Sequence, residues 1–205
     1  IEAVPEVKNS SKAGDPPASH NYSGKGVNFF SGDKEIDIQL QLIYGDKNFL
    51  PLYDIDLIAG RLPLHDSISE YVINETLMRQ LGFQNPEEVL GQQIKDGVKN
   101  IPIVGVMEDF NQRSLRASID PMAFFRSVQG NILHFSFQAT DRKNWTEAID
   151  KIEAHWQQFY PEQTFQLYFV DDLVQTFYRQ EKRTATLLKW ATVLAIVISC
   201  LGLLG

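Results

Sequence analysis

The amino-acid sequence predicts an α+β domain followed by the start of a membrane-spanning helix, and three stretches support this prediction. Residues 34–44, KEIDIQLQLIY, alternate apolar and polar side chains, which is typical of a half-buried strand. Residues 131–170 predict a strand, a long amphipathic helix and a second strand, an order that packs a helix on a sheet. Residues 187–205 contain one charged side chain, Lys189, and are otherwise mostly apolar.

Composition places the chain among globular proteins and narrows its partners. It has 205 residues, of which 43% are apolar and 22% charged, and a formal net charge of −7. Because nucleic-acid binding needs a concentrated basic surface, this acidic balance argues against a nucleic-acid partner. The one cysteine, Cys200, permits no disulfide within the chain. The chain opens on Ile1 without a leader pattern and closes within an apolar run, so we expect a segment of a longer chain.

Further elements are predicted in chain order from turn signals and apolar periodicity. A Pro-, Gly- and Ser-rich run, Ala13–Gly26, predicts an exposed loop, and 45–61 predicts a short helical turn that leads into another loop. In 71–83, YVINETLMRQLGF, a strand passes into a short helix with Asn74 as its N-cap. The remaining predictions are a turn at 85–94, an apolar strand at 100–110 and another strand after 116.

The last third gives the clearest pattern. Residues 132–139 place Leu133, Phe135 and Phe137 on one face of a strand, which leaves His134 on the polar face. Residues 164–170, TFQLYFV, alternate in the same way and predict the second strand. The helix between them, at 141–161, has an apolar stripe of Trp145, Ile149, Ile152, Trp156 and Phe159.

One continuous helix of about 30 residues is predicted over 171–205, with Asp171 or Asp172 as its N-cap and its membrane-spanning part from about residue 187. Nineteen residues of helix cover ~28 Å, and Trp190 lies where an interfacial aromatic belongs. The alternative is a buried core helix, which is usually shorter and keeps a polar face. Because a rigid helix transmits displacement along its axis, we expect the domain and the membrane segment to be mechanically coupled.

Charge alone leaves the membrane sidedness open. By the positive-inside rule, the basic residues before the span favour a cytoplasmic location. Long domains, however, cross the membrane largely regardless of local charge. The basic residues concerned are Arg179, Lys182, Arg183 and Lys189.

No residue is predicted to be catalytic, cofactor-binding or metal-ligating. Glu108 and Asp109 are adjacent, but neighbours in an extended segment point to opposite faces, which favours a strand-to-loop turn over a catalytic carboxylate pair. The SGKG stretch at 23–26 lacks the other residues of a phosphate-binding loop, and the glycosylation-type pattern at Asn21 is frequent by chance. Cys200 lies in the predicted membrane span, where a thiol cannot act as a nucleophile. The scattered histidines, none with a second ligand at metal-site spacing, are His20, His65, His134 and His155.

Several stretches in a fixed order suggest a known family. Each is a weak signal alone, but together they resemble the extracytoplasmic (periplasmic) core domain of FtsX-like, MacB-type ABC transporter permeases, in the two-domain type common in Bacteroidota. The similarity runs from about Val4 to Gly205. The stretches are IAGR at 58–61, YVINETLMRQLGF at 71–83, PEEVLGQQI at 86–94, IPIVGVMEDFNQRSLRASIDP at 101–121 and the run 177–205, which resembles the family's passage into a transmembrane helix.

The resemblance implies a domain organisation and a cellular context. It implies a discontinuous porter-like lobe, 1–62 plus 128–175, with a smaller β-rich, Sabre-like lobe, 63–127, inserted, and then the long helix 171–205. It implies a domain on the periplasmic side of the cytoplasmic (inner) membrane. The implied partners are an ABC ATPase subunit, a second permease copy in a dimer, and a periplasmic adaptor or outer-membrane protein.

The function implied by the resemblance is non-catalytic. The domain would couple ATP-driven movement of membrane helices to export or mechanotransmission of a substrate outside the membrane, with no cofactor of its own. Family members act on widely different substrates, so the resemblance names none. An alternative is an extracytoplasmic ligand-sensing domain of a membrane signalling receptor, which also precedes a membrane helix. A membrane-tethered enzyme is the third interpretation, and no constellation of residues supports it.

Overall fold

The protein is described by a computed structural model, which divides into two compact units, Ile1–Gln166 and Leu167–Gly205. The first unit contains β-strands and four helices among its described residues, and the second contains one long helix. The structure describes residues 4–17, 19, 23–32, 34–66, 68–112, 117–127, 130–138 and 142–204.

The strands and helices alternate irregularly along the chain, as expected for an α+β fold. The strands are β1 (Val7–Ala13), β2 (Ser23–Ser31), β3 (Lys34–Gly45), β4 (Leu57–Gly60), β5 (Tyr71–Asn74), β6 (Gln93–Asp96), β7 (Lys99–Met107), β8 (Met122–Arg126) and β9 (Ile132–Phe137). The helices are α1 (Phe49–Leu52), α2 (Glu75–Gln80), α3 (Pro86–Val89), α4 (Arg142–Phe159) and α5 (Val170–Leu204).

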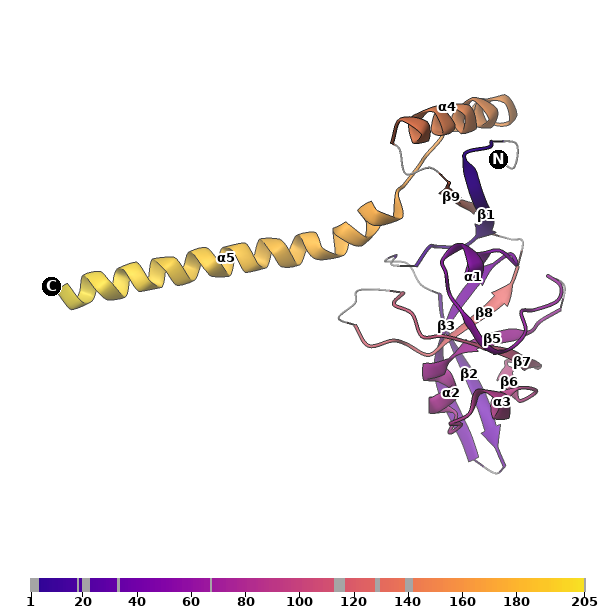
Figure 1. Ribbon diagram of the computed structural model, residues 1–205. Coiled ribbons are helices and arrows are strands. Elements are labelled where there is room, and N and C mark those ends of the chain that lie inside the picture. The colour runs from indigo at the N-terminus through magenta and orange to yellow at the C-terminus, as the bar shows by residue number, and fades with distance from the viewer. Residues whose placement is uncertain are drawn as a thin grey trace. The chain divides into compact units, whose positions relative to one another are not determined.

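Six strands close into a barrel. Around the ring, β2 is followed by β6, β7, β5, β8 and β3, and β3 pairs again with β2. The β3–β8 and β5–β7 pairs are parallel and the others are antiparallel, and β4 adds to the barrel beside β7. The barrel is lined by buried apolar side chains such as Phe29, Leu40 and Ile103, and α2 and α3 lie against it (Figure 1).

A layer formed by β1, β9 and α4 lies at one end of β3. β1 pairs antiparallel with β9, and α4 covers one face of this strand pair (Figure 1). Ala148 and Ile152 of α4 are buried against Val7, Phe135 and Phe137. We call β1, β9 and α4 the α4 layer. The predicted division into a porter-like and a Sabre-like lobe stays a prediction, since β3 belongs to the barrel and also contacts the α4 layer.

The strongest local patterns are confirmed. The alternating run 34–44 is β3, with Ile38 and Leu40 buried. The Asn74 side chain caps α2 by accepting a hydrogen bond from the Leu77 N–H (3.0 Å). The amphipathic run is α4, although Phe159 is 76% exposed and therefore lies off the buried stripe. The 3.6-residue periodicity identifies a face of the helix, but it does not say how much of that face is covered by other residues.

Other predictions are wrong in detail. The predicted loop Ala13–Gly26 begins and ends in strands, β1 and β2, and the predicted loop before Arg61 contains β4. β1 and β6 are too polar to show a strand pattern and form because their neighbours supply hydrogen-bond partners. No strand forms over residues 164–169, which were predicted to complete the strand–helix–strand unit. An alternating apolar and polar sequence forms a strand only where a neighbouring strand pairs with it, and the alternation itself does not supply that neighbour.

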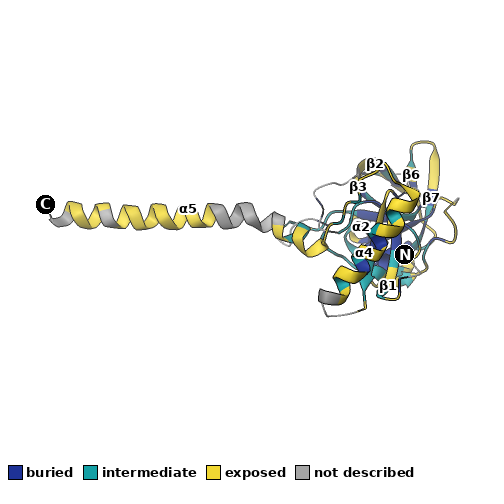
Figure 2. Cartoon of the chain, turned by 90° about the horizontal axis from the view of Figure 1, so that it is seen from above, coloured by how far each residue is buried: buried dark blue, intermediate teal, exposed yellow. Residues whose placement is uncertain are grey.

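The second unit consists largely of α5, an uninterrupted helix of 35 residues. It begins at Val170, so Asp171 and Asp172 lie in its first turn rather than at the N-cap, where they still complement the helix dipole. Within the described residues, one segment is long and apolar enough to cross a membrane, Thr184–Gly202, and none of it is buried (Figure 2). This segment matches the predicted span from about residue 187.

Candidate functional site

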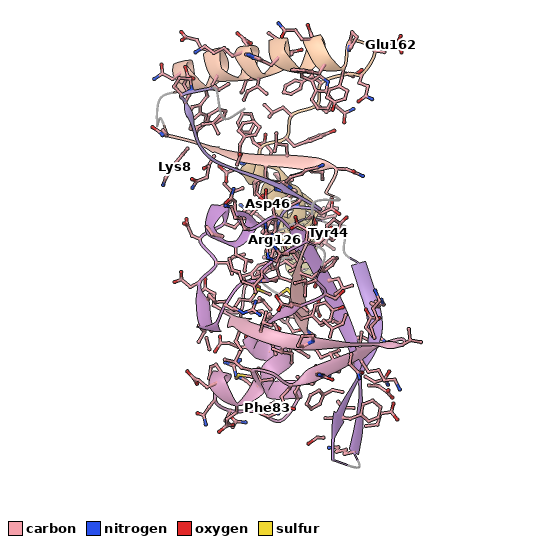
Figure 3. The ribbon with its side chains drawn as sticks, turned by 90° about the vertical axis from the view of Figure 1, so that its right-hand side faces the viewer. Lys8, Tyr44, Asp46, Phe83, Arg126 and Glu162 are labelled. Atoms are coloured by element: carbon pink, nitrogen blue, oxygen red, sulfur yellow. The ribbon has the colours of Figure 1, made fainter. Side chains whose placement is uncertain are left out.

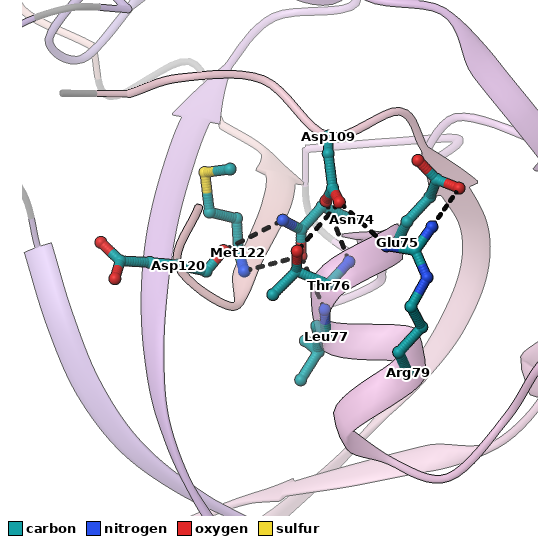
Figure 4. A network of polar contacts seen from close by, with 8 residues as sticks. All are labelled: Asn74, Glu75, Thr76, Leu77, Arg79, Asp109, Asp120 and Met122. Atoms are coloured by element: carbon teal, nitrogen blue, oxygen red, sulfur yellow. Dashed lines mark hydrogen bonds and ion pairs between the residues drawn. The ribbon is translucent and has the colours of Figure 1, made fainter. Parts of the chain in front are cut away.

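The acidic pair that follows β7 was the most tempting catalytic candidate, and the structure gives each carboxylate a structural partner. The Asp109 carboxylate accepts hydrogen bonds from the Thr76 N–H and the Thr76 hydroxyl, both at 2.9 Å, and pairs with Arg79 at 3.2 Å (Figure 4). A negative charge at the start of α2 complements the helix dipole. Asp109 therefore anchors α2.

Glu108 turns the other way, as expected for neighbours in an extended segment. Its carboxylate accepts a hydrogen bond from the Asp56 N–H (3.1 Å), and its own N–H donates to the Asp56 carbonyl (3.0 Å). Glu108 thus fastens the start of β4 to the end of β7, and the two carboxylates do not converge on a common site.

Asn74 lies at the centre of the same network and is fully buried (Figure 4). Its Oδ1 accepts from the Leu77 N–H (3.0 Å) and from the Met122 N–H (2.9 Å). Its Nδ2 donates to the Asp120 carbonyl (3.0 Å). One side chain therefore joins β5, the start of α2 and the start of β8.

Arg61, the last residue of the IAGR stretch, holds the connection from β4 to β5. Its guanidinium makes two hydrogen bonds to the Glu70 carboxylate, at 2.6 and 2.9 Å. Glu70 also accepts from the Leu64 N–H (3.0 Å), and its side chain is buried. The hydrogen bonds from Arg61 lower the pKa of the Glu70 carboxyl below its ordinary value. The pair is bidentate and specific in geometry, and its role is structural.

The histidines are not brought together. His65 and His155 are exposed, and His155 Nδ1 lies 2.7 Å from the carbonyl of Lys151 on its own helix. His134 is buried, contrary to its predicted place on a polar face, because its face of β9 is covered by α1. His20 lies outside the described residues. Within the described part of the chain no group of three or more His, Cys, Asp or Glu could hold a metal ion.

The remaining motif candidates are also explained by the fold. The SGKG stretch is the start of β2 rather than a loop, and Lys25 pairs there with Asp96 (2.5 Å). The glycosylation-type Asn21 lies outside the described residues. A surface pocket of about 240 Å³ lies beside β1 and α1 and is lined by Lys8, Asn9, Ser10, Asn48 and Pro51. None of these side chains is a nucleophile or a general base placed against a partner.

The remaining candidate feature is α5. It links a folded domain to an apolar segment and contains no Pro, the commonest cause of a sharp helix kink. The sequence predicted this element from its composition alone. The chemistry of the first unit offers no competing site among the described residues.

Comparisons with known proteins agree with this picture. The family model described as the MacB-like periplasmic core domain matches residues 3–155. No curated protein matches the sequence significantly.

Several solved structures are similar in fold, among them the two that follow. The periplasmic region of MacB from Actinobacillus actinomycetemcomitans aligns with a TM-score of 0.58 at 13% identity, over 87% of this chain and 79% of that one. A domain of a candidate permease protein from Porphyromonas gingivalis aligns with a TM-score of 0.53 at 19% identity, over 77% of this chain and 66% of that one. At these identities the likeness is one of fold.

Proposed function

Because the chain belongs to the family of MacB-like periplasmic core domains, we propose that it couples ATP-driven movement of membrane helices to export or mechanotransmission of a substrate outside the cytoplasmic membrane. The family is that of ABC transporter permeases, so an ATPase belongs to its context. The family match favours this function over the ligand-sensing receptor, the alternative from sequence. The coupling role itself rests on α5.

The length and continuity of α5 carry the proposal. Its 35 residues extend for ~52 Å, of which the 19 residues of Thr184–Gly202 take up ~28 Å, about the thickness of a bilayer core. The helix therefore continues for more than three turns beyond the apolar segment on the side of the folded domain. A tilt or axial shift of the membrane part would be carried along this uninterrupted helix to its first residue, Val170.

A non-catalytic role agrees with the polar chemistry of the first unit. Asp109, Glu108 and Glu70 hold backbone segments in place, and His134 is enclosed between other residues. The partners in this proposal are an ABC ATPase subunit, a second permease copy and a periplasmic adaptor or outer-membrane protein. The membrane is the cytoplasmic one, with the domain on its outer side.

A break in α5 tests the coupling. In the permease that contains this domain, assembled with its ATPase in lipid nanodiscs, Cys200 and every cysteine outside residues 1–205 are replaced by Ser. Glu147→Cys then gives each copy one spin label at an exposed position of α4. In a dimer, the distance between the two labels should change on addition of ATP. Insertion of Gly-Pro after Thr186 should abolish this change while ATP hydrolysis continues, because the inserted pair breaks the helix.

The matched control is insertion of Ala-Ala at the same point. It adds the same two residues and the same rotation of about 200° but keeps the helix continuous. The proposal predicts that Ala-Ala retains an ATP-dependent change in distance that Gly-Pro loses. An unchanged ATP response in the Gly-Pro protein would refute coupling through α5, and the absence of any inter-label distance would refute the dimer.

A further inference from the structure

The α4 layer joins the barrel through a narrow neck. β1 pairs with β9 at six registered positions, but among the described residues it pairs with β3 at one, Ala13 with Gly45. Beside that pair, Gly14 N–H donates to the Tyr44 carbonyl and Asp46 N–H donates to the Lys12 carbonyl, both at 3.0 Å. We call residues 10–15, 44–53 and His134 the neck. Figure 3 labels Tyr44 and Asp46 at this level, between α4 and the barrel.

Polar side chains reinforce the few backbone bonds of the neck. The Asp46 carboxylate accepts from the Ser11 hydroxyl (2.8 Å) and from the N–H groups of Lys12 and Asn48, both at 2.9 Å. The Asn48 amide donates to the Ser10 carbonyl (3.0 Å). These bonds tie β1 to the turn before α1.

His134 of β9 makes the second connection across the neck, to the end of β1 and to the end of α1. Its Nε2 lies 2.8 Å from the Gly14 carbonyl at the end of β1, and its Nδ1 lies 2.6 Å from the Tyr53 hydroxyl at the end of α1. A carbonyl can only accept, so Nε2 must carry the proton of a neutral ring, and Tyr53 then donates to Nδ1. The imidazole is 7% exposed and packs edge-on against Phe49.

A second proton on His134 would disrupt this arrangement. Nδ1 would become a donor, and the hydroxyl hydrogen of Tyr53, a half-buried residue, would lose its acceptor. Burial lowers the pKa of His134 below its ordinary value. The hydrogen bond to the Gly14 carbonyl and the charges of Asp15 and Asp46 raise this pKa, but by less than burial lowers it. Burial raises the pKa of Tyr53, so the phenol stays neutral. The Lys12 side chain of β1 is exposed.

We propose that the neck is a hinge between the α4 layer and the barrel, which is locked while His134 is neutral and loosened when His134 takes up a second proton. The sign follows from the protonation equilibrium. Because the folded state disfavours the charged imidazole, the lock is complete above the ordinary pKa of histidine, about 6.5, and weakens as the pH falls below it. A domain outside the cytoplasmic membrane meets the pH of its surroundings. The hinge goes beyond the proposed coupling function and requires neither ATP nor an ATPase.

Distances across the neck test the hinge. In the 205-residue chain in detergent micelles, Cys200→Ser leaves no native thiol, and spin labels are placed at Glu147→Cys on α4 and Lys99→Cys on the barrel, two exposed positions. One narrow distance distribution is expected at neutral pH. At about pH 5 the distribution should broaden by roughly a factor of two, because a released hinge samples more than one arrangement.

Three variants assign any change to His134. His134→Gln keeps an N–H for the Gly14 carbonyl and cannot take up a proton, so its distribution should stay narrow at both pH values. Tyr53→Phe removes the hydroxyl but keeps the ring, so the neutral imidazole loses a stabilising bond and the midpoint should rise by about half a pH unit. The matched control is His155→Gln, an exposed histidine of α4, which should leave the midpoint unchanged.

Two results would overturn the proposal: a wild-type distribution that is the same at both pH values, or a broadening in His134→Gln as large as in wild type. If His134→Gln does not fold, the imidazole ¹⁵N resonances of the wild-type chain decide. They should show the Nε2–H tautomer at neutral pH and a midpoint below the ordinary histidine value of about 6.5. The other tautomer, or a midpoint above that value, would refute the lock.

Discussion

Replacing Asn74 by Ala should be among the most damaging single changes in the first unit. The side chain is fully buried and makes hydrogen bonds to three backbone groups, those of Leu77, Met122 and Asp120. Loss of an N-cap costs about 1 kcal/mol. Leaving the buried Met122 N–H without its acceptor costs ~1–3 kcal/mol more. We therefore expect the free energy of unfolding to fall by about 3 kcal/mol.

The assay is urea unfolding of the 205-residue chain in mild detergent, followed by near-ultraviolet circular dichroism. This signal reports the aromatic side chains packed in the first unit, whereas the far-ultraviolet signal would be dominated by α5. The matched control is Asn85→Ala, at the N-cap of α3, where the side chain makes no capping bond and its amide bonds only to the exposed Glu88. It should cost less than about 0.5 kcal/mol. Equal losses in the two variants would refute the structural role assigned to Asn74.

Two further predictions concern the connection from β4 to β5 and the glycines of tight turns. Glu70→Gln should cost about 1 kcal/mol at pH 7 in the same assay, since Arg61 is partly exposed and its pairing is screened. Because the pKa of Glu70 is lowered in the folded state, its stabilising effect is present above the ordinary carboxyl pKa and is lost as the pH falls through the folded-state pKa. The free energies of unfolding of wild type and Glu70→Gln should therefore converge in acid. A difference that persists in acid would contradict this reasoning. Gly60→Ala should cost several kcal/mol, because φ is +76° and a Cβ would meet the Val104 carbonyl, whereas Gly82→Ala, at φ +95° in open space, should cost only about 1 kcal/mol. Similar losses at both positions would show that the close approach to Val104 adds nothing.

Local signals in the sequence were sufficient where one segment controls its own conformation. Asn74 before a polar-apolar run predicts a capped helix because the cap bonds to a residue three positions on. The alternation in β3 and the stripe of α4 likewise reflect one face of one element. For Glu108 and Asp109 the sequence favoured a strand-to-loop turn over a carboxylate pair, and the structure gives each of them a contact to backbone.

Contacts between distant segments could not be predicted in this way. β1 and β6 are strands because other strands accept and donate their hydrogen bonds, and no short pattern in their own sequences encodes this. His134 was placed on a polar face because its neighbours in β9 are apolar. It is buried because α1, 81 residues away at Tyr53, covers that face.

An α+β domain and a long helix with an apolar second half could be predicted from residue patterns alone, because composition and periodicity are properties of single segments. The closing of β2, β3 and β5–β8 into a barrel, and the meeting of Asp46, Tyr53 and His134 at the neck, became visible in the folded chain. A hydrogen bond between distant residues depends on how the whole chain is folded, whereas the sequence around each residue records only its own neighbours.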